Sequence, residues 1–346
     1  MKATLSSVQL RAPSKVILSG ENAVVFGATA VACAIDLPNS CRMMEWDNAY
    51  FRISTGSTIA EFDREECIAT YHRMMKLCNS RNYKEIEASL QRKSLLWVIA
   101  IIGKLLYDGI HLPYSQADVH LAVPLGSGLG GSTTTTVLIV KSLLLLAHQP
   151  VSRQQLYELS ALGDRIAHGG TGSGTDSAAI VRGGCISYHQ YARIRDIKVR
   201  SPLQFVLCDS GEDKISSTSL ARFRQHHDHN PVRFQKMIAE FNTLSTQLIT
   251  LLESSCAPNR LGSYLNRNHT LLQKMGVSTA ELDKIVQLSL EMGAAGAKLT
   301  GGGCGGYALI LARPAHVEKI VTVLKASGKS VLNVKLQNYE GRANVI

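Results

Sequence analysis

Three short glycine-rich windows hold most of the residues in this sequence that could carry chemistry. Together they contain 18 of its 28 glycines. The first window reads PLGSGLGGS at 124–132 and precedes an apolar run that predicts a helix at 132–147. The first amides of a helix are unpaired and its dipole is positive there, so a flexible backbone at this point can bind a phosphate. The candidate phosphate ligands are Gly126, Ser127, Gly128, Leu129, Gly130, Gly131 and Ser132.

Two other nucleotide-binding motifs can be excluded from the sequence. GSGLGG has the GxGxxG pattern, but no Asp or Glu occurs from 132 to 157, where a dinucleotide-binding domain needs an acidic residue. The GKS at 328–330 lacks the earlier glycine of a Walker A loop. A phosphate loop therefore remains, with an ordinary glycine-rich turn as the alternative. The Ser132 hydroxyl could cap the helix or bind a metal ion.

The second window, at 163–184, contains two carboxylates separated by 12 positions. Asp164 lies near the end of a predicted helix, and Asp176 lies in a predicted loop of Gly, Thr, Ser and Ala. Small neighbours would admit a substrate close to Asp176, which makes it a candidate base. A turn-forming or capping role is the alternative. His168 is expected to be a packed or capping histidine.

The third window, at 293–311, has five glycines within 301–306, directly before a predicted strand. Such a backbone can approach a ligand or another loop closely, and tight bends at a domain junction are the alternative. A separate N-terminal segment, APSKVILSGENAVVFG, places Lys15, Glu21 and Asn22 on or beside the first strands.

The elements that must position these residues are a mixture of helices and strands. Helical spacing predicts helices at 84–108, 132–147, 152–167, 232–255, 279–292 and 314–327. Short apolar runs predict strands at 118–123, 185–189, 204–208 and 307–312. Ser152 with Gln155, and Ser278 with Glu281, have the spacing of capping boxes. Without strict βαβ alternation, this order predicts the α+β class, with domains at 1–199 and 200–346.

Composition excludes several classes of protein. A chain of 346 residues with 45% apolar residues can build two cores and is not disordered. No apolar run reaches the roughly 18 residues of a membrane span, and no secretory signal is expected at the N-terminus. The eight cysteines are scattered without a CxxC pair, which predicts reduced thiols and a cytoplasmic location. The net charge of +10 is not concentrated in one block, so anionic small substrates are expected rather than nucleic acid.

Taken together, the N-terminal segment and the three windows resemble, in order, the motifs of the GHMP small-molecule kinases. KVILSGENAVVFG, DRIAHGGTGSGTD and KLTGGGCGG are most similar to those of eukaryotic-type mevalonate kinases. The resemblance covers about residues 11–312. It implies a two-domain α+β GHMP kinase fold with the active site in the interdomain cleft. It further implies that the protein uses ATP and Mg²⁺ to phosphorylate the 5-hydroxyl of mevalonate. The product would be 5-phosphomevalonate, a precursor of isoprenoids and sterols. The resemblance also implies a homodimer.

The resemblance also implies roles for individual residues. Asp176 would be the catalytic base, and Lys15 would keep it ionised and stabilise the reacting oxygen. Ser132 and Asp164 would bind Mg²⁺, and the loop amides would bind the ATP phosphates. The mevalonate site would be formed by Lys15, Glu21, Asn22 and Asp176.

Three positions depart from the family pattern. Ser14 stands where the family has Gly, Asn22 replaces a His, and Asp164 replaces a metal-binding Glu that is one methylene longer. The alternatives are another GHMP kinase, acting on phosphomevalonate or a sugar, or a degenerate kinase fold that serves as a sensor. The sensor is disfavoured because the chain retains Lys15, Ser132, Asp164 and Asp176. A sugar kinase is disfavoured because no N-terminal sugar-recognition motif is present.

Overall fold

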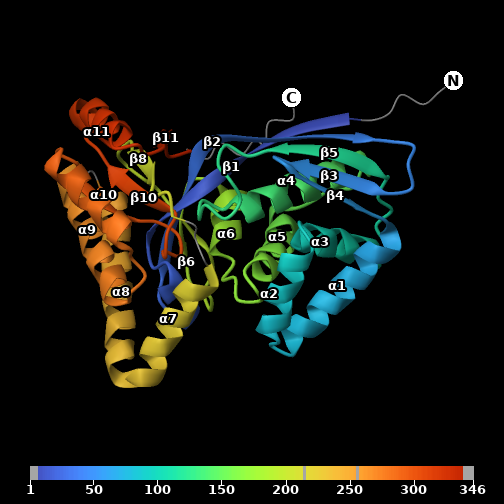
Figure 1. The fold of residues 1–346 in the computed structure, drawn as a ribbon, viewed down its shortest axis with the longest axis horizontal. Helices are drawn as coiled ribbons and strands as arrows, with labels where there is room; N and C mark the ends of the chain where they lie inside the picture. Colours follow the sequence, from blue (N-terminus) through green and yellow to red (C-terminus); the bar gives the residue numbers. More distant parts are fainter. Residues whose placement is uncertain (1–6, 213–215, 255–256, 338–346) are drawn as a thin grey trace.

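The computed structural model describes residues 7–212, 216–254 and 257–337, which fold around two β-sheets (Figure 1). The first sheet has seven strands in the order β4-β3-β5-β2-β6-β7, with β1 paired to β2. Its strands are β1 (Ser7–Ser19), β2 (Ala30–Glu45), β3 (Phe51–Thr55), β4 (Thr58–Phe62), β5 (Ser115–His120), β6 (Cys185–Tyr188) and β7 (Arg195–Ile197).

Strand β2 organises this sheet because it pairs with three partners. Along one edge it runs antiparallel to β1, and along the other it pairs with β6 at 30–33 and with β5 at 40–45. Every residue of 30–35 is buried, whereas the part after Asp36 alternates between buried and exposed residues. Alternation of this kind is typical of a strand with one face in a core and the other towards solvent.

Helices cover one face of the first sheet. They are α1 (Arg64–Asn79), α2 (Tyr83–Arg92), α3 (Leu96–Tyr107), α4 (Gly131–Leu146), α5 (Arg153–Ala167) and α6 (Thr175–Arg182). The short 3-10 helix η1 (Asn22–Phe26) instead contacts helices of the second half of the chain. Helix α4 packs on β1 and β2, and α3 and α5 pack against α4 (Figure 1). The predicted helices at 132–147 and 152–167 are confirmed, and α5 begins with the predicted capping box of Ser152 and Gln155.

The predicted helix at 84–108 is wrong as a single element. The chain forms α2 and α3 instead, because Leu95 adopts a left-handed backbone with φ 56° between them. That conformation is unfavourable for a residue with a side chain, but it places Leu95 in the core at 1% exposure. The strand predicted at 118–123 is also displaced. Strand β5 ends at His120, and its inward residues are Ser115, Ala117 and Val119.

The second sheet has four antiparallel strands in the order β11-β8-β10-β9. They are β8 (Gln204–Asp209), β9 (Gly296–Leu299), β10 (Tyr307–Leu311) and β11 (Val331–Lys335). The accompanying helices are α7 (Ser216–His229), α8 (Pro231–Leu252), α9 (Pro258–Lys274), α10 (Ala280–Glu291) and α11 (Pro314–Ala326). The capping box predicted at Ser278 is wrong, since Thr279 caps α10 and the Ser278 hydroxyl donates to Asp283.

The two halves share a continuous core, and the predicted α+β class is confirmed. Val16 and Val31 of the first sheet pack in one apolar cluster with Phe205 and Leu309 of the second. The chain passes from one sheet to the other between β7 and β8, where the domain division predicted at 199 and 200 lies; its position stays a prediction. The cysteines in the described ranges are free thiols, and Cys256 lies outside those ranges. Among the described helices, none is both long and apolar enough to cross a membrane.

Candidate active site

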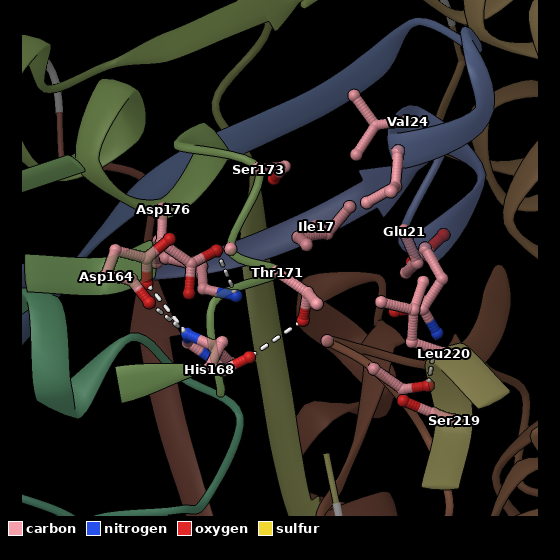
Figure 2. Close-up of a pocket in the computed structure, with 16 residues that line it drawn as sticks. Ile17, Glu21, Val24, Asp164, His168, Thr171, Ser173, Asp176, Ser219 and Leu220 are labelled. Atoms are coloured by element: carbon pink, nitrogen blue, oxygen red, sulfur yellow. Dashed lines mark hydrogen bonds and ion pairs between the residues drawn. The ribbon is translucent and has the colours of Figure 1, made fainter. Parts of the chain in front are cut away.

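A pocket forms where the N-terminal segment, the second glycine window and the second half of the chain meet (Figure 2). Its empty space, with the open mouth included, is about 620 Å³. The walls come from the end of β1 and η1, from the 164–176 segment, from α7 and from the third window. They include Lys15, Glu21, Asn22, Asp164, His168, Asp176, Ser219, Leu220, Gly301 and Gly302. The predicted site residues outside the phosphate loop therefore converge on one cavity.

Lys15 and Asp176 form an ion pair at the pocket wall, with 2.7 Å between Lys15 Nζ and Asp176 Oδ1. The side chain of Lys15 is 3% exposed and that of Asp176 is 15% exposed, so the pair is buried but still reaches the cavity. Asp176 was predicted in a loop, and this is wrong. It lies in the first turn of α6, which begins after Gly174 at φ 84°. A carboxylate there is favoured by the helix dipole.

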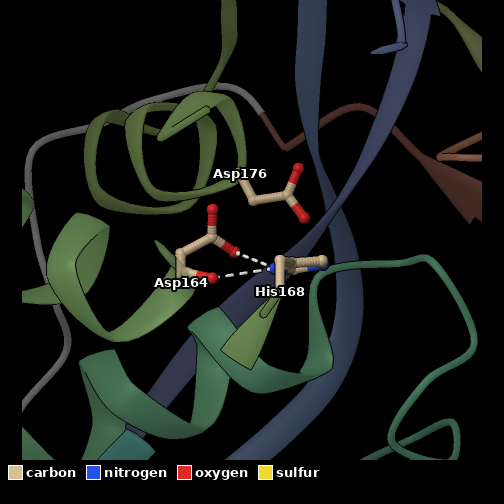
Figure 3. Close-up of side chains that lie close together, drawn as sticks. All are labelled: Asp164, His168 and Asp176. Atoms are coloured by element: carbon tan, nitrogen blue, oxygen red, sulfur yellow. Dashed lines mark hydrogen bonds and ion pairs between the residues drawn. The ribbon is translucent and has the colours of Figure 1, made fainter. Parts of the chain in front are cut away.

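Asp164 lies behind this pair, near the C-terminal end of α5 (Figure 3). Its Oδ1 accepts a hydrogen bond of 2.9 Å from the Thr133 hydroxyl and lies 3.1 Å from Nδ1 of His168. Burial raises the pKa of Asp164, but His168, Thr133 and Lys15 together outweigh burial and hold that pKa below its usual value. The buried carboxylate is therefore kept ionised, as a cation ligand must be.

His168 was predicted to be a packed or capping histidine, and it is the C-cap residue of α5, but it also lines the pocket. Its ring faces Asp164 four residues earlier, one turn back along the chain (Figure 3). Three ligand atoms lie within 4.8 Å of one another, one from each of Asp164, His168 and Asp176. The signal available in the sequence was the four-residue spacing between Asp164 and His168, which puts both side chains on one face of a helix.

The phosphate loop has the backbone that its sequence predicts. Gly126, Gly128 and Gly130 all have φ between 84° and 86°, and α4 begins directly afterwards. The loop is tied to β1, because the Lys15 amide donates to the Leu129 carbonyl at 3.1 Å. Two of its amides are already engaged within the loop, those of Ser127 and Leu129, at 3.3 and 3.4 Å.

Glycine at two loop positions is required by close packing. A Cβ at Gly130 would lie 2.9 Å from Ile180 and 3.0 Å from the Lys15 side chain. A Cβ at Gly301, in the third window, would lie 2.8 Å from the backbone oxygen of Gly128. The first and third windows therefore touch each other through their backbones, and the tight bends of the third window close the phosphate loop from the side of the second domain.

Ser132 stays a predicted metal and phosphate ligand. Its half-buried side chain is not among those that line this pocket, and the neighbouring Thr133 is the residue that bonds Asp164. Successive helical residues point about 100° apart, so one turn of α4 cannot direct both hydroxyls at the same carboxylate. Thr133 is a second site residue that the sequence analysis missed.

Glu21 and Asn22 both lie at the pocket and both bond to the third window. The Asn22 amide donates to the Gly302 carbonyl at 2.9 Å. Glu21 forms a fully buried ion pair with Lys298, a residue that sequence reasoning did not select although it begins the KLTGGG motif. Asn at position 22 therefore connects this wall of the pocket to the third window.

Comparison with known proteins agrees with this geometry. Residues 96–184 match the model of the GHMP kinases N terminal domain, and residues 251–330 match the GHMP kinases C terminal model. The mevalonate kinase of Thermococcus sibiricus is 26% identical over 94% of this chain and 95% of its own length. That of Schizosaccharomyces pombe is 27% identical over 93% of this chain and 87% of its own length.

A solved structure shows the same fold. The crystal structure of L. major mevalonate kinase in complex with R-mevalonate superposes with a TM-score of 0.76 at 24% identity, covering 96% of this chain and 97% of that one. The chain therefore contains the N-terminal and C-terminal domains of the GHMP kinases, in that order.

Proposed function

We propose that this chain is a mevalonate kinase, which transfers the γ-phosphoryl group of ATP to the 5-hydroxyl of mevalonate and forms 5-phosphomevalonate. The observation that carries the proposal is the Lys15–Asp176 pair, at 2.7 Å, facing a pocket beside a glycine loop at a helix N-terminus. The relatives named mevalonate kinase, which align with more than nine-tenths of the chain, support mevalonate as the alcohol.

Asp176 accepts the proton of the substrate hydroxyl as that oxygen attacks the γ-phosphorus. The P–O bond to the β-phosphate breaks in the same step and ADP leaves. Lys15, already bound to Asp176, stabilises the negative charge that develops on the attacking oxygen. The glycine loop and the start of α4 bind the triphosphate through backbone amides.

The acidic cluster fits Mg²⁺, the usual partner of ATP. The oxygen donors of Asp164 and Asp176 suit a hard divalent cation, and Asp164 is held ionised as described above. Bound there, the ion would neutralise charge on the phosphates. Asp164 is the proposed main ligand, and Ser132 stays a predicted one. Homodimer formation and a cytoplasmic location, both expected from the sequence, also stay predictions.

The fold alone does not select the substrate among the GHMP kinases. ADP release should therefore be measured with MgATP and a panel of mevalonate, phosphomevalonate, galactose and homoserine. Turnover with mevalonate above all others is the expected result. Preference for phosphomevalonate or galactose would support the alternative kinases. ATP binding without turnover of any alcohol would support the sensor and overturn the proposed enzyme.

A further inference from the structure

Lys298 is buried at the junction between the two domains and has no direct access to the reacting groups. It lies on β9 of the second sheet with 0% of its side chain exposed. A lysine ammonium has three protons to donate. Here it donates to the carbonyl of Ile17 on β1 at 3.0 Å, to the carbonyl of Leu299 at 2.5 Å and to Oε1 of Glu21. Its hydrogen-bonding capacity is therefore fully used.

Lys298 binds only one of the two carboxylate oxygens of Glu21. Oε1 is bound by Lys298, whereas Oε2 is buried and has no hydrogen-bond partner among the described residues. Glu21 is one of the residues that line the pocket, close to Ile17 and Val24 (Figure 2), and its side chain is fully buried there. A buried carboxylate oxygen without a partner is costly, so its presence at a cavity wall points to a donor supplied by a ligand.

We propose that Lys298 is a positioning residue for the alcohol substrate, acting through Glu21: it holds Oε1 so that Oε2 is presented to a hydroxyl donor of the bound substrate. This inference rests on the proposed function, and it deepens that function by assigning the second domain a part in substrate recognition. The reacting groups, Lys15 and Asp176, come from β1 and α6, on the side of the first sheet. The contact of β9 with β1 thus completes the part of the pocket wall that contains Glu21.

A purely structural role for Lys298 would predict a different behaviour. Thr300 makes a comparable buried connection at the same junction, because its hydroxyl accepts from the Ile17 amide at 2.9 Å and donates to the Ile17 carbonyl at 3.2 Å. Thr300 is 1% exposed and has no bond to Glu21 among the described contacts. A Thr300→Val variant therefore loosens the junction without releasing the carboxylate, which makes it the matched control.

The test compares Lys298→Met, Thr300→Val, Glu21→Gln and the double variant Glu21→Gln/Lys298→Met in steady-state kinetics. Loss of an oriented, charge-assisted hydrogen bond predicts a KM for mevalonate about 10- to 100-fold higher in Lys298→Met, with KM for ATP unchanged. Glu21→Gln should have a similar effect, and the double variant should match Glu21→Gln alone. Thr300→Val should leave KM for mevalonate at the wild-type value.

Equal changes in both KM values, a Thr300→Val effect as large as that of Lys298→Met, or independent effects that multiply in the double variant would each overturn the inference. If Lys298→Met does not fold, the double variant, which leaves no buried charge without a partner, replaces it and must match Glu21→Gln. A wild-type protein without mevalonate turnover would refute the proposed function itself. An active wild type with an unchanged Lys298→Met would refute only the role of Lys298.

Discussion

Replacing Asp176 by Asn is the most direct test of the proposed chemistry. The change keeps the shape of the side chain on α6 and its hydrogen-bond acceptor towards Lys15, but it removes the base. A positioned general base contributes about 10²- to 10⁴-fold to a rate. We therefore expect kcat to fall by that factor, equivalent to about 3–5 kcal/mol of transition-state stabilisation. The affinity for ATP should not change, since the phosphate loop is untouched.

The same substitution has a second consequence, for stability. Lys15 is 3% exposed and would lose its carboxylate partner. Removal of one partner from a fully buried ion pair costs about 3–5 kcal/mol. The Asn oxygen still accepts a hydrogen bond and the pocket admits water, so a loss of about 1–3 kcal/mol is expected here. Urea unfolding of both proteins at pH 7 measures this difference.

The assay follows ADP release at saturating mevalonate and MgATP, with ATP affinity measured by calorimetry. Asp196→Asn is the matched control, because Asp196 pairs with Arg182 at the other end of α6 and its side chain is 64% exposed. This control should keep wild-type kcat. An Asp176→Asn protein with wild-type turnover would refute the assignment of the base. A lost ATP affinity would show that Asp176 acts in nucleotide binding instead.

Three further predictions concern groups around the pair. Gly301→Ala should raise KM for ATP and lower the melting temperature, because its Cβ would lie 2.8 Å from backbone of the phosphate loop. Thr133→Val should raise the Mg²⁺ concentration needed for half-maximal activity, since Asp164 loses a 2.9 Å hydrogen bond. Burial lowers the pKa of His269 to about 4. As the pH falls, the unfolded chain therefore protonates this histidine before the folded chain does. The free energy of unfolding should fall by about 3 kcal/mol as the pH is lowered from 6.5 to 4, and this fall should be smaller in His269→Gln.

Each of these predictions has a control. Gly328 has φ 78°, close to the 77° of Gly301, but open space around its Cβ position, so Gly328→Ala imposes the backbone strain without the collision. Equal effects of the two substitutions would contradict the close approach of the loops. Thr135→Val removes a hydroxyl bond within α4 and should not change the Mg²⁺ requirement. An identical pH dependence of unfolding in wild type and His269→Gln would contradict the role assigned to His269.

The sequence by itself determined the class of the fold and most of the local elements. Capping at Ser152 and the apolar run after Gly131 placed α5 and α4, because caps and helical spacing depend on residues within one or two turns. The glycine spacing at 126, 128 and 130 likewise specified a left-handed backbone at a helix N-terminus. The break at Leu95 was not predictable, since burial in the distant core stabilises that conformation.

Tertiary structure decided which residues act together. Lys15 and Asp176 are 161 positions apart and Glu21 and Lys298 are 277 apart, and no local pattern reports such pairings. Whether Ser132 or Thr133 faces Asp164 depends on the rotation of α4 against α5, which packing sets and sequence spacing does not. The sequence motifs thus identified the residues that could do chemistry. Folding decided which charged residues pair, because a buried charge without a partner is too costly to retain.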